Sequence, residues 1–95
     1  MPRDIFTVYT TTQLFFHNLQ IGVGNIKYRT LANKGQDEKN VLTAELWISL
    51  EDDADPPTLF IVRDSQTIEY KGYTIYIVEI GENERGQYVI LKING

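Results

Sequence analysis

The chain has 95 residues, no cysteine and a formal net charge of −4, from nine basic and thirteen acidic side chains. This length suffices for one domain with a single core, and the apolar fraction of 42% argues against disorder. The missing cysteines exclude disulfides and thiolate metal sites, and the acidic balance argues against binding to nucleic acid or to an anionic membrane surface.

The first third of the chain reads as strands joined by a turn. Residues 5–10 are β-branched and aromatic, and residues 14–23 form a second predicted strand. Its alternation places one set of side chains on the first face and a second set on the other, namely Phe15, His17, Leu19, Ile21 and Val23 against Leu14, Phe16, Asn18 and Gln20. The glycines of segment 22–25 predict a hairpin turn, from which residues 26–31 return as a strand with Lys27 and Arg29 on a wet face.

Residues 32–40 are polar, include a glycine, and predict a loop. Residues 41–50 then give the clearest alternation of apolar and polar side chains in the chain, with five apolar residues on the predicted core face: Leu42, Ala44, Leu46, Ile48 and Leu50. A short helix is the alternative, because alanine, leucine and glutamate favour helices. The strict alternation favours a strand.

Residues 51–58 break the pattern, since Pro56 and Pro57 cannot donate to a strand ladder. A strand over 59–63 follows. Residues 67–93 predict a meander of three antiparallel runs, divided at Lys71-Gly72 and at 81–86. The run 73–80 is apolar on both faces, so we expect a central strand, or one with a face covered by a partner.

The whole chain, residues 1–95, is therefore predicted to be a single all-β domain of about seven short strands. The expected architecture is an antiparallel β-sandwich or a small, partly open barrel with a C-terminal meander. No linker, internal repeat or low-complexity segment is evident. The absence of a secretory signal and of an apolar run near ~20 residues favours a soluble protein of the cytoplasm.

The sequence offers few groups for catalysis. His17 is the only histidine and Ser49 and Ser65 are the only serines, none in a nucleophile-elbow motif. Gly22-Val23-Gly24 precedes no helix and is not a phosphate-binding loop. No cofactor is predicted. A carboxylate-dependent enzyme stays an alternative, based on three glutamates of which the last lies on a predicted buried strand: Glu45, Glu69 and Glu79.

One acidic cluster resembles a set of metal ligands, formed by Glu51, Asp52, Asp53 and Asp55. Hard cations such as Ca²⁺ bind carboxylate oxygens of flexible loops, so a cation- or small-ligand-binding module is one alternative function. The spacing lacks the glycine and the closing glutamate of an EF-hand loop. A solvated loop that discourages edge pairing is the interpretation that we favour for the cluster.

The aromatic residues carry the leading hypothesis. Trp47 alternates away from the predicted core face of its strand, and Tyr76 and Tyr88 lie on neighbouring predicted strands. Exposed amphipathic rings on a rigid sheet are typical of protein interfaces, whereas the same residues could also line the second half of a sandwich core. We therefore expect a non-enzymatic domain that binds a protein partner or itself, with these three aromatic residues as candidate binding residues.

Overall fold

The computed structural model describes residues 4–31 and 39–95, and every regular element in them is a β-strand. Eight strands follow one another in the described residues, against about seven predicted from the sequence. Their bounds are β1 Asp4–Tyr9, β2 Gln13–Phe16, β3 Leu19–Leu31, β4 Lys39–Leu50, β5 Thr58–Arg63, β6 Thr67–Tyr70, β7 Tyr73–Asn83 and β8 Gly86–Asn94.

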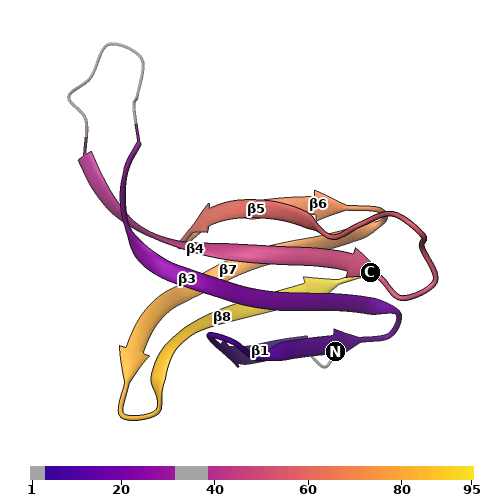
Figure 1. Ribbon diagram of the computed structural model, residues 1–95, viewed down its shortest axis with the longest axis horizontal. Coiled ribbons are helices and arrows are strands. Elements are labelled where there is room, and N and C mark those ends of the chain that lie inside the picture. The colour runs from indigo at the N-terminus through magenta and orange to yellow at the C-terminus, as the bar shows by residue number, and fades with distance from the viewer. Residues whose placement is uncertain (1–3, 32–38) are drawn as a thin grey trace.

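The strands form two four-stranded antiparallel sheets that pack face to face as a β-sandwich, which confirms the predicted fold class (Figure 1). Sheet A has the order β1-β8-β7-β6 and sheet B the order β2-β3-β4-β5. The predicted C-terminal meander is confirmed as β6, β7 and β8, which are neighbours in sheet A. The alternative helix over residues 41–50 is wrong, because this segment lies within β4.

The core lies between the sheets and is built by alternate residues of each strand. In β4 the predicted inward set is confirmed: Ala44, Leu46 and Ile48 are fully buried. The other residues of this core with no exposed surface come from the central strands of both sheets: Leu19, Ile21, Ile75, Ile77, Val89, Leu91 and Ile93. Half-buried apolar rings and side chains close the margins of the sandwich.

At both margins of the sandwich the chain crosses from one sheet to the other through a three-residue corner. The first corner, residues 10–12, joins β1 of sheet A to β2 of sheet B, and residues 64–66 join β5 to β6. The middle residues, Thr11 and Ser65, have positive φ angles of 67° and 63°. Their amides donate to Val23 O at 2.9 Å and to Ile77 O at 2.7 Å, so each corner is hydrogen-bonded to a long strand, β3 or β7.

These matching corners belong to two copies of one four-stranded unit, the N-terminal repeat (β1–β4) and the C-terminal repeat (β5–β8). The first strands of the two repeats begin 54 positions apart, at residues 4 and 58, and the second and third strands keep this offset, at 13 and 67 and at 19 and 73. In the fourth strands the residues that occupy equivalent places in the pairing register are 45 positions apart, because the β7–β8 connection is shorter. The cross-strand pair Gly22–Trp47 accordingly corresponds to Tyr76–Lys92.

The pairings between the repeats are equivalent as well. β4 pairs with β5 and β8 pairs with β1 in corresponding registers, for example Leu46–Phe60 and Leu91–Phe6. If the two repeats are exchanged, the strand order of one sheet becomes the strand order of the other. The sandwich therefore has approximate two-fold symmetry. The register shift in β3 after Val23 also recurs in β7 after Ile77.

The expectation that the chain has no internal repeat is thus wrong. At equivalent positions the strands share few residues, and all of these are apolar: Phe6/Phe60, Val8/Val62, Ile21/Ile75, Ile26/Ile80, Leu46/Leu91 and Ile48/Ile93. Five of these pairs are buried and the phenylalanines pack against the core. A repeat that is shared only in its core resembles the ordinary alternation of any β-domain, which is why the sequence pattern did not reveal it.

The predicted hairpin at residues 22–25 is also wrong, because β3 runs through this segment and the turn lies earlier, at His17-Asn18. His17 has a φ of 54°, and the turn reverses which residues face the core. Leu14 and Phe16 of β2 pack against the core, whereas Phe15 is 60% exposed. Gly22 and Gly24 lie on the outer face of β3, beside Trp47, and do not form a turn.

β7 and β8 are the central strands of sheet A, but β7 is not covered on both faces. Tyr76 and Val78 are 38% and 41% exposed on the outer side of the sheet. A bulge between Ile77 and Glu79 then shifts the alternation, so Ile80 is buried and Glu79 is exposed. The expected burial of Glu79 is therefore wrong.

Candidate functional site

The aromatic residues selected from the sequence do not form one surface. Trp47 lies on the outer face of sheet B, whereas Tyr76 and Tyr88 lie in β7 and β8 of sheet A. Trp47 is 44% exposed, so it belongs to the solvent side of β4 and not to the second half of the core. The two sheets therefore present different candidate surfaces.

Trp47 is the centre of an apolar surface that continues onto edge strand β5. It pairs across the strands with Leu59, and the next pair of the same face joins Glu45 to Ile61. Leu59 and Ile61 are 42% and 40% exposed. We call Trp47, Leu59 and Ile61 the Trp47 face. The sequence reasoning missed the last two residues, although β5 alternates them with the inward Phe60 and Val62.

Two glycines of β3 leave room beside the indole. Trp47 pairs with Gly22, and a Cβ atom placed on Gly24 would lie 3.4 Å from the indole Nε1 and 2.8 Å from Oε1 of Glu45. A side chain at Gly24 would thus displace the groups that cover it. At Gly22 the nearest atoms to such a Cβ are at ordinary contact distance, 3.8–4.0 Å. The glycines allow the ring to lie close to the backbone of β3.

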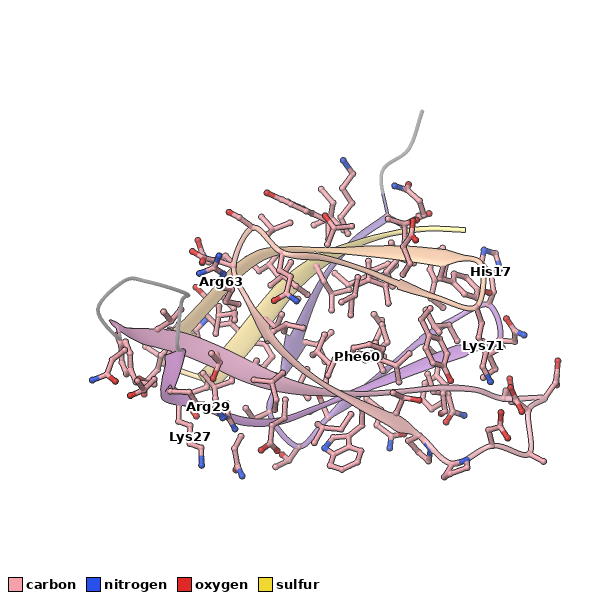
Figure 2. All side chains as sticks on the ribbon, turned by 90° about the horizontal axis from the view of Figure 1, so that it is seen from above. His17, Lys27, Arg29, Phe60, Arg63 and Lys71 are labelled. Atoms are coloured by element: carbon pink, nitrogen blue, oxygen red, sulfur yellow. The ribbon has the colours of Figure 1, made fainter. Side chains whose placement is uncertain are left out.

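Polar side chains border the Trp47 face on one side. Glu45 accepts a hydrogen bond from Arg29 at 2.9 Å, and the guanidinium also donates to the Thr43 hydroxyl. Thr43 in turn donates to the carbonyl of Lys27 at 2.9 Å and pairs with Arg63 in the strand ladder. Lys27 and Arg63 are both exposed. Figure 2 shows Lys27 and Arg29 pointing away from the sandwich on the same side, with Arg63 apart from them and outside the border. This border carries more positive than negative charge.

Tyr88 makes a separate polar cluster on sheet A. Its hydroxyl donates to Glu79 Oε2 at 2.6 Å, and its ring packs edge-on against Tyr9 with centroids 5.9 Å apart. The hydrogen bond to the carboxylate, aided by desolvation, raises the pKa of Tyr88 above its usual value. A Cβ atom on Gly81 would lie 2.7 Å from the Tyr88 hydroxyl, so the ring covers this glycine. The cluster is compact and internally satisfied.

The acidic loop is partly engaged by a lysine. Lys71, in the β6–β7 turn, contacts Asp53 and lies 3.2 Å from Asp55 Oδ2. The hydrogen bond from Lys71 holds the pKa of Asp53 below its usual value and raises that of Lys71. Glu51 and Asp52 are exposed. In residues 4–31 and 39–95 no group of three acidic or histidine side chains is arranged to hold a metal ion, and the cation-binding alternative stays a prediction.

The residues considered for catalysis are scattered. His17 and Lys71 lie at one end of the sandwich in Figure 2, and Arg63, two residues before Ser65, lies at the other. Glu45 is on the outer face of sheet B, bound to Arg29, whereas Glu69 and Glu79 are exposed residues of sheet A. Ser49 lies opposite Gln20 in the β3–β4 ladder, and in the described residues no hydrogen bond joins two of these candidate groups.

No protein-family model matches this chain, and no curated protein or solved structure gives a significant match. In the part of the chain that the structure describes, no helix has the length and apolar character needed to cross a membrane.

The predicted loop at 32–40 lies outside the described residues up to position 38, and residues 39 and 40 belong to β4.

Proposed function

We propose that this chain is a non-enzymatic binding domain that docks a protein partner on the Trp47 face. The observation that supports the proposal is the adjacency of Trp47, Leu59 and Ile61, each at least 40% exposed, on one sheet surface. Single exposed apolar residues are ordinary in soluble proteins, whereas adjoining ones that include a tryptophan are typical of interaction sites.

The backbone beneath the Trp47 face is rigid enough to present it. Trp47 sits on β4, a central strand that is hydrogen-bonded to β3 on one side and to β5 on the other. The indole lies close to Gly24, so it needs little reordering when a partner covers it. Leu59 and Ile61 extend the surface to the edge of sheet B, where a partner has access from the side.

The charge beside this surface supports a proposal for the chemistry of the partner. The chain carries a net charge of −4, yet the border of the Trp47 face holds Lys27 and Arg29 against Glu45. We therefore infer a partner segment with apolar side chains flanked by carboxylates, because such a segment is attracted to this border and repelled by the acidic remainder. The absence of cysteine accords with a reducing compartment such as the cytoplasm.

The internal repeat provides a matched control for this proposal. The positions of sheet A that correspond to Trp47, Leu59 and Ile61 are Lys92, Ile5 and Thr7. Substituting Trp47→Lys and Ile61→Thr gives sheet B the residues that sheet A already tolerates at the same backbone positions. Ile5→Thr, at a residue that is 51% exposed, removes apolar surface from the other sheet.

The test is selection of a random peptide display library on the immobilised protein. We expect enriched peptides that combine aromatic or aliphatic residues with aspartate or glutamate. Their affinity should fall at least tenfold for Trp47→Lys/Ile61→Thr, stay unchanged for Ile5→Thr, and weaken between 0.1 and 0.5 M salt.

Two results would contradict the proposal. One is the enrichment of peptides that bind the double variant as tightly as the native chain. The other is concentration-dependent dimerisation in light scattering that the double variant abolishes, because that result would assign the Trp47 face to a second copy of the chain.

A further inference from the structure

A pocket opens at the end of the sandwich where the two long hairpins separate. At the left of Figure 1, β3 and β4 curve in one direction and β7 and β8 in the other. The pocket has a volume of about 390 Å³ and is lined by Ile26, Lys27, Tyr28, Leu42, Gly81, Glu82 and Gln87. This volume is within the range of concave small-molecule sites.

The internal repeat relates the residues on one side of this pocket to those on the other side. Tyr28 and Glu82 are equivalent positions of β3 and β7, and Leu42 and Gln87 are equivalent positions of β4 and β8. Within each repeat the two residues are also cross-strand partners: Tyr28 pairs with Leu42, and Glu82 pairs with Gln87. The pocket therefore lies on the approximate two-fold axis, and each repeat contributes the same backbone positions to one of its walls.

The two walls differ in chemistry although their backbones correspond. The N-terminal repeat contributes an apolar wall of Ile26, Tyr28 and Leu42. The C-terminal repeat contributes Glu82 and Gln87, and the Gln87 amide donates to the carbonyl of Ile26 at 3.2 Å. This hydrogen bond links the two walls of the pocket. Equivalent backbone positions thus provide one apolar wall and one acidic wall.

The basic residue of the lining does not cancel the acidic one. Lys27 alternates with Ile26 and Tyr28 along β3, and Figure 2 shows its side chain pointing away from the sandwich, on the side of Arg29. In residues 4–31 and 39–95 no cation lies within ion-pair distance of Glu82. The charge that the described walls present to the pocket is therefore negative.

We propose that this pocket binds a small organic ammonium ion carried on an apolar body. The ammonium group binds the Glu82 carboxylate, and the apolar body packs on Tyr28 and Leu42. A charge-assisted hydrogen bond to a carboxylate is stronger than a neutral one, and the tyrosine ring adds attraction for a cation. At about 30 Å³ per water molecule the pocket holds roughly a dozen waters, which limits the ligand to a similar number of heavy atoms. This site is separate from the Trp47 face.

The test is a titration of the ¹⁵N-labelled full chain, followed by NMR, with 2-phenylethylammonium and separately with 3-phenylpropionate. The two probes have a similar apolar body and opposite charge. We expect the ammonium ion to shift the amide signals of Tyr28, Gly81, Glu82 and Gln87 with saturation, and the carboxylate to bind at least tenfold more weakly.

Two variants with the same loss of charge provide the control. Glu82→Gln should weaken the binding of 2-phenylethylammonium about tenfold, whereas Glu84→Gln, in the neighbouring turn and outside the lining, should change it less than twofold. Leu42→Gln introduces the residue type found at the equivalent position of the C-terminal repeat, Gln87. It should weaken the binding of both probes because it removes apolar surface. Equal binding of the two probes, shifts confined to other surfaces, or equal effects of the two glutamate variants would overturn the proposal.

Discussion

Thr11 and Ser65 are equivalent residues of two chain halves: both have left-handed backbone conformations, and both donate an amide hydrogen bond to the fifth residue of a long strand in the sheet that the corner enters. This correspondence holds the sandwich together at its two margins. It also shows that the eight strands are two copies of one unit, which makes many predictions testable within a single molecule.

The first prediction concerns equivalent core positions. Ile21 and Ile75 are fully buried and occupy the same place in the two repeats. We expect Ile21→Ala and Ile75→Ala each to lower the free energy of unfolding by about 2–5 kcal/mol, and by similar amounts, because each removes the same side chain from an equivalent position of the core. Ile5→Ala, on the exposed face, should change it by less than about 0.5 kcal/mol. Denaturant titration measures all three, and very different losses for the two buried positions would contradict their equivalence.

The second prediction concerns the strained corner at Thr11. A β-branched residue in the left-handed region costs about 1–2 kcal/mol, whereas glycine adopts it freely. We expect Thr11→Gly to stabilise the chain by about 0.5 kcal/mol once the flexibility of glycine in the unfolded state is included. Thr10→Gly, next to it and without a positive φ, should destabilise it. Thermal unfolding of both variants gives the comparison, and a loss of stability in Thr11→Gly would contradict the strain.

The third prediction concerns the two glycines beside Trp47. Gly22 has room for a methyl group, so Gly22→Ala should be neutral or should stabilise β3 by about 0.5–1 kcal/mol. Gly24→Ala should displace Glu45 and the indole, because its Cβ atom would approach Oε1 of Glu45 to 2.8 Å. The Trp47 emission spectrum should therefore change in Gly24→Ala and stay native in Gly22→Ala. The same spectrum in both variants would show that the ring does not lie against Gly24.

The fourth prediction is a dependence on alkaline pH. The hydrogen bond to Glu79 raises the pKa of Tyr88 above its usual value of 10.0. A raised pKa means that the stabilisation is complete below pH 10 and is lost as the pH rises from there through the folded pKa of Tyr88. Glu79→Ala should lower the pKa of Tyr88, read from its Cζ signal by ¹³C NMR. Glu69→Ala, an exposed carboxylate on β6 that makes no hydrogen bond to this tyrosine, should leave it unchanged.

The alternation of side chains predicted the strands, the sandwich and most of the core. It succeeded in β4 because Leu42 to Leu50 keep one period from end to end. It failed where the backbone departs from a regular ladder: the turn at His17 reversed the faces of β2, and the bulge before Glu79 reversed the faces of β7. Such local changes move side chains to the other face without leaving a distinct pattern in the sequence.

The candidate sites depended on contacts between distant segments. The sequence alone favoured a second core layer for Trp47, and only the sheet order, which leaves the outer face of β4 uncovered, decided its exposure. The pairing of β4 with β5 then added Leu59 and Ile61 to that surface. The pocket residues Tyr28 and Glu82 are far apart in the chain and meet because the two repeats face each other across the approximate two-fold axis.

The sequence by itself thus determined the fold class, since burial of alternate apolar residues is a local property that each strand expresses alone. The chemistry excluded by the lack of cysteine and of a second histidine was also evident from composition. Only the tertiary structure decided that the chain is a repeat, because the two halves agree in register and in core residues while their surfaces differ. It also decided which side chains share a surface, because that depends on how the strands are ordered within the sheets.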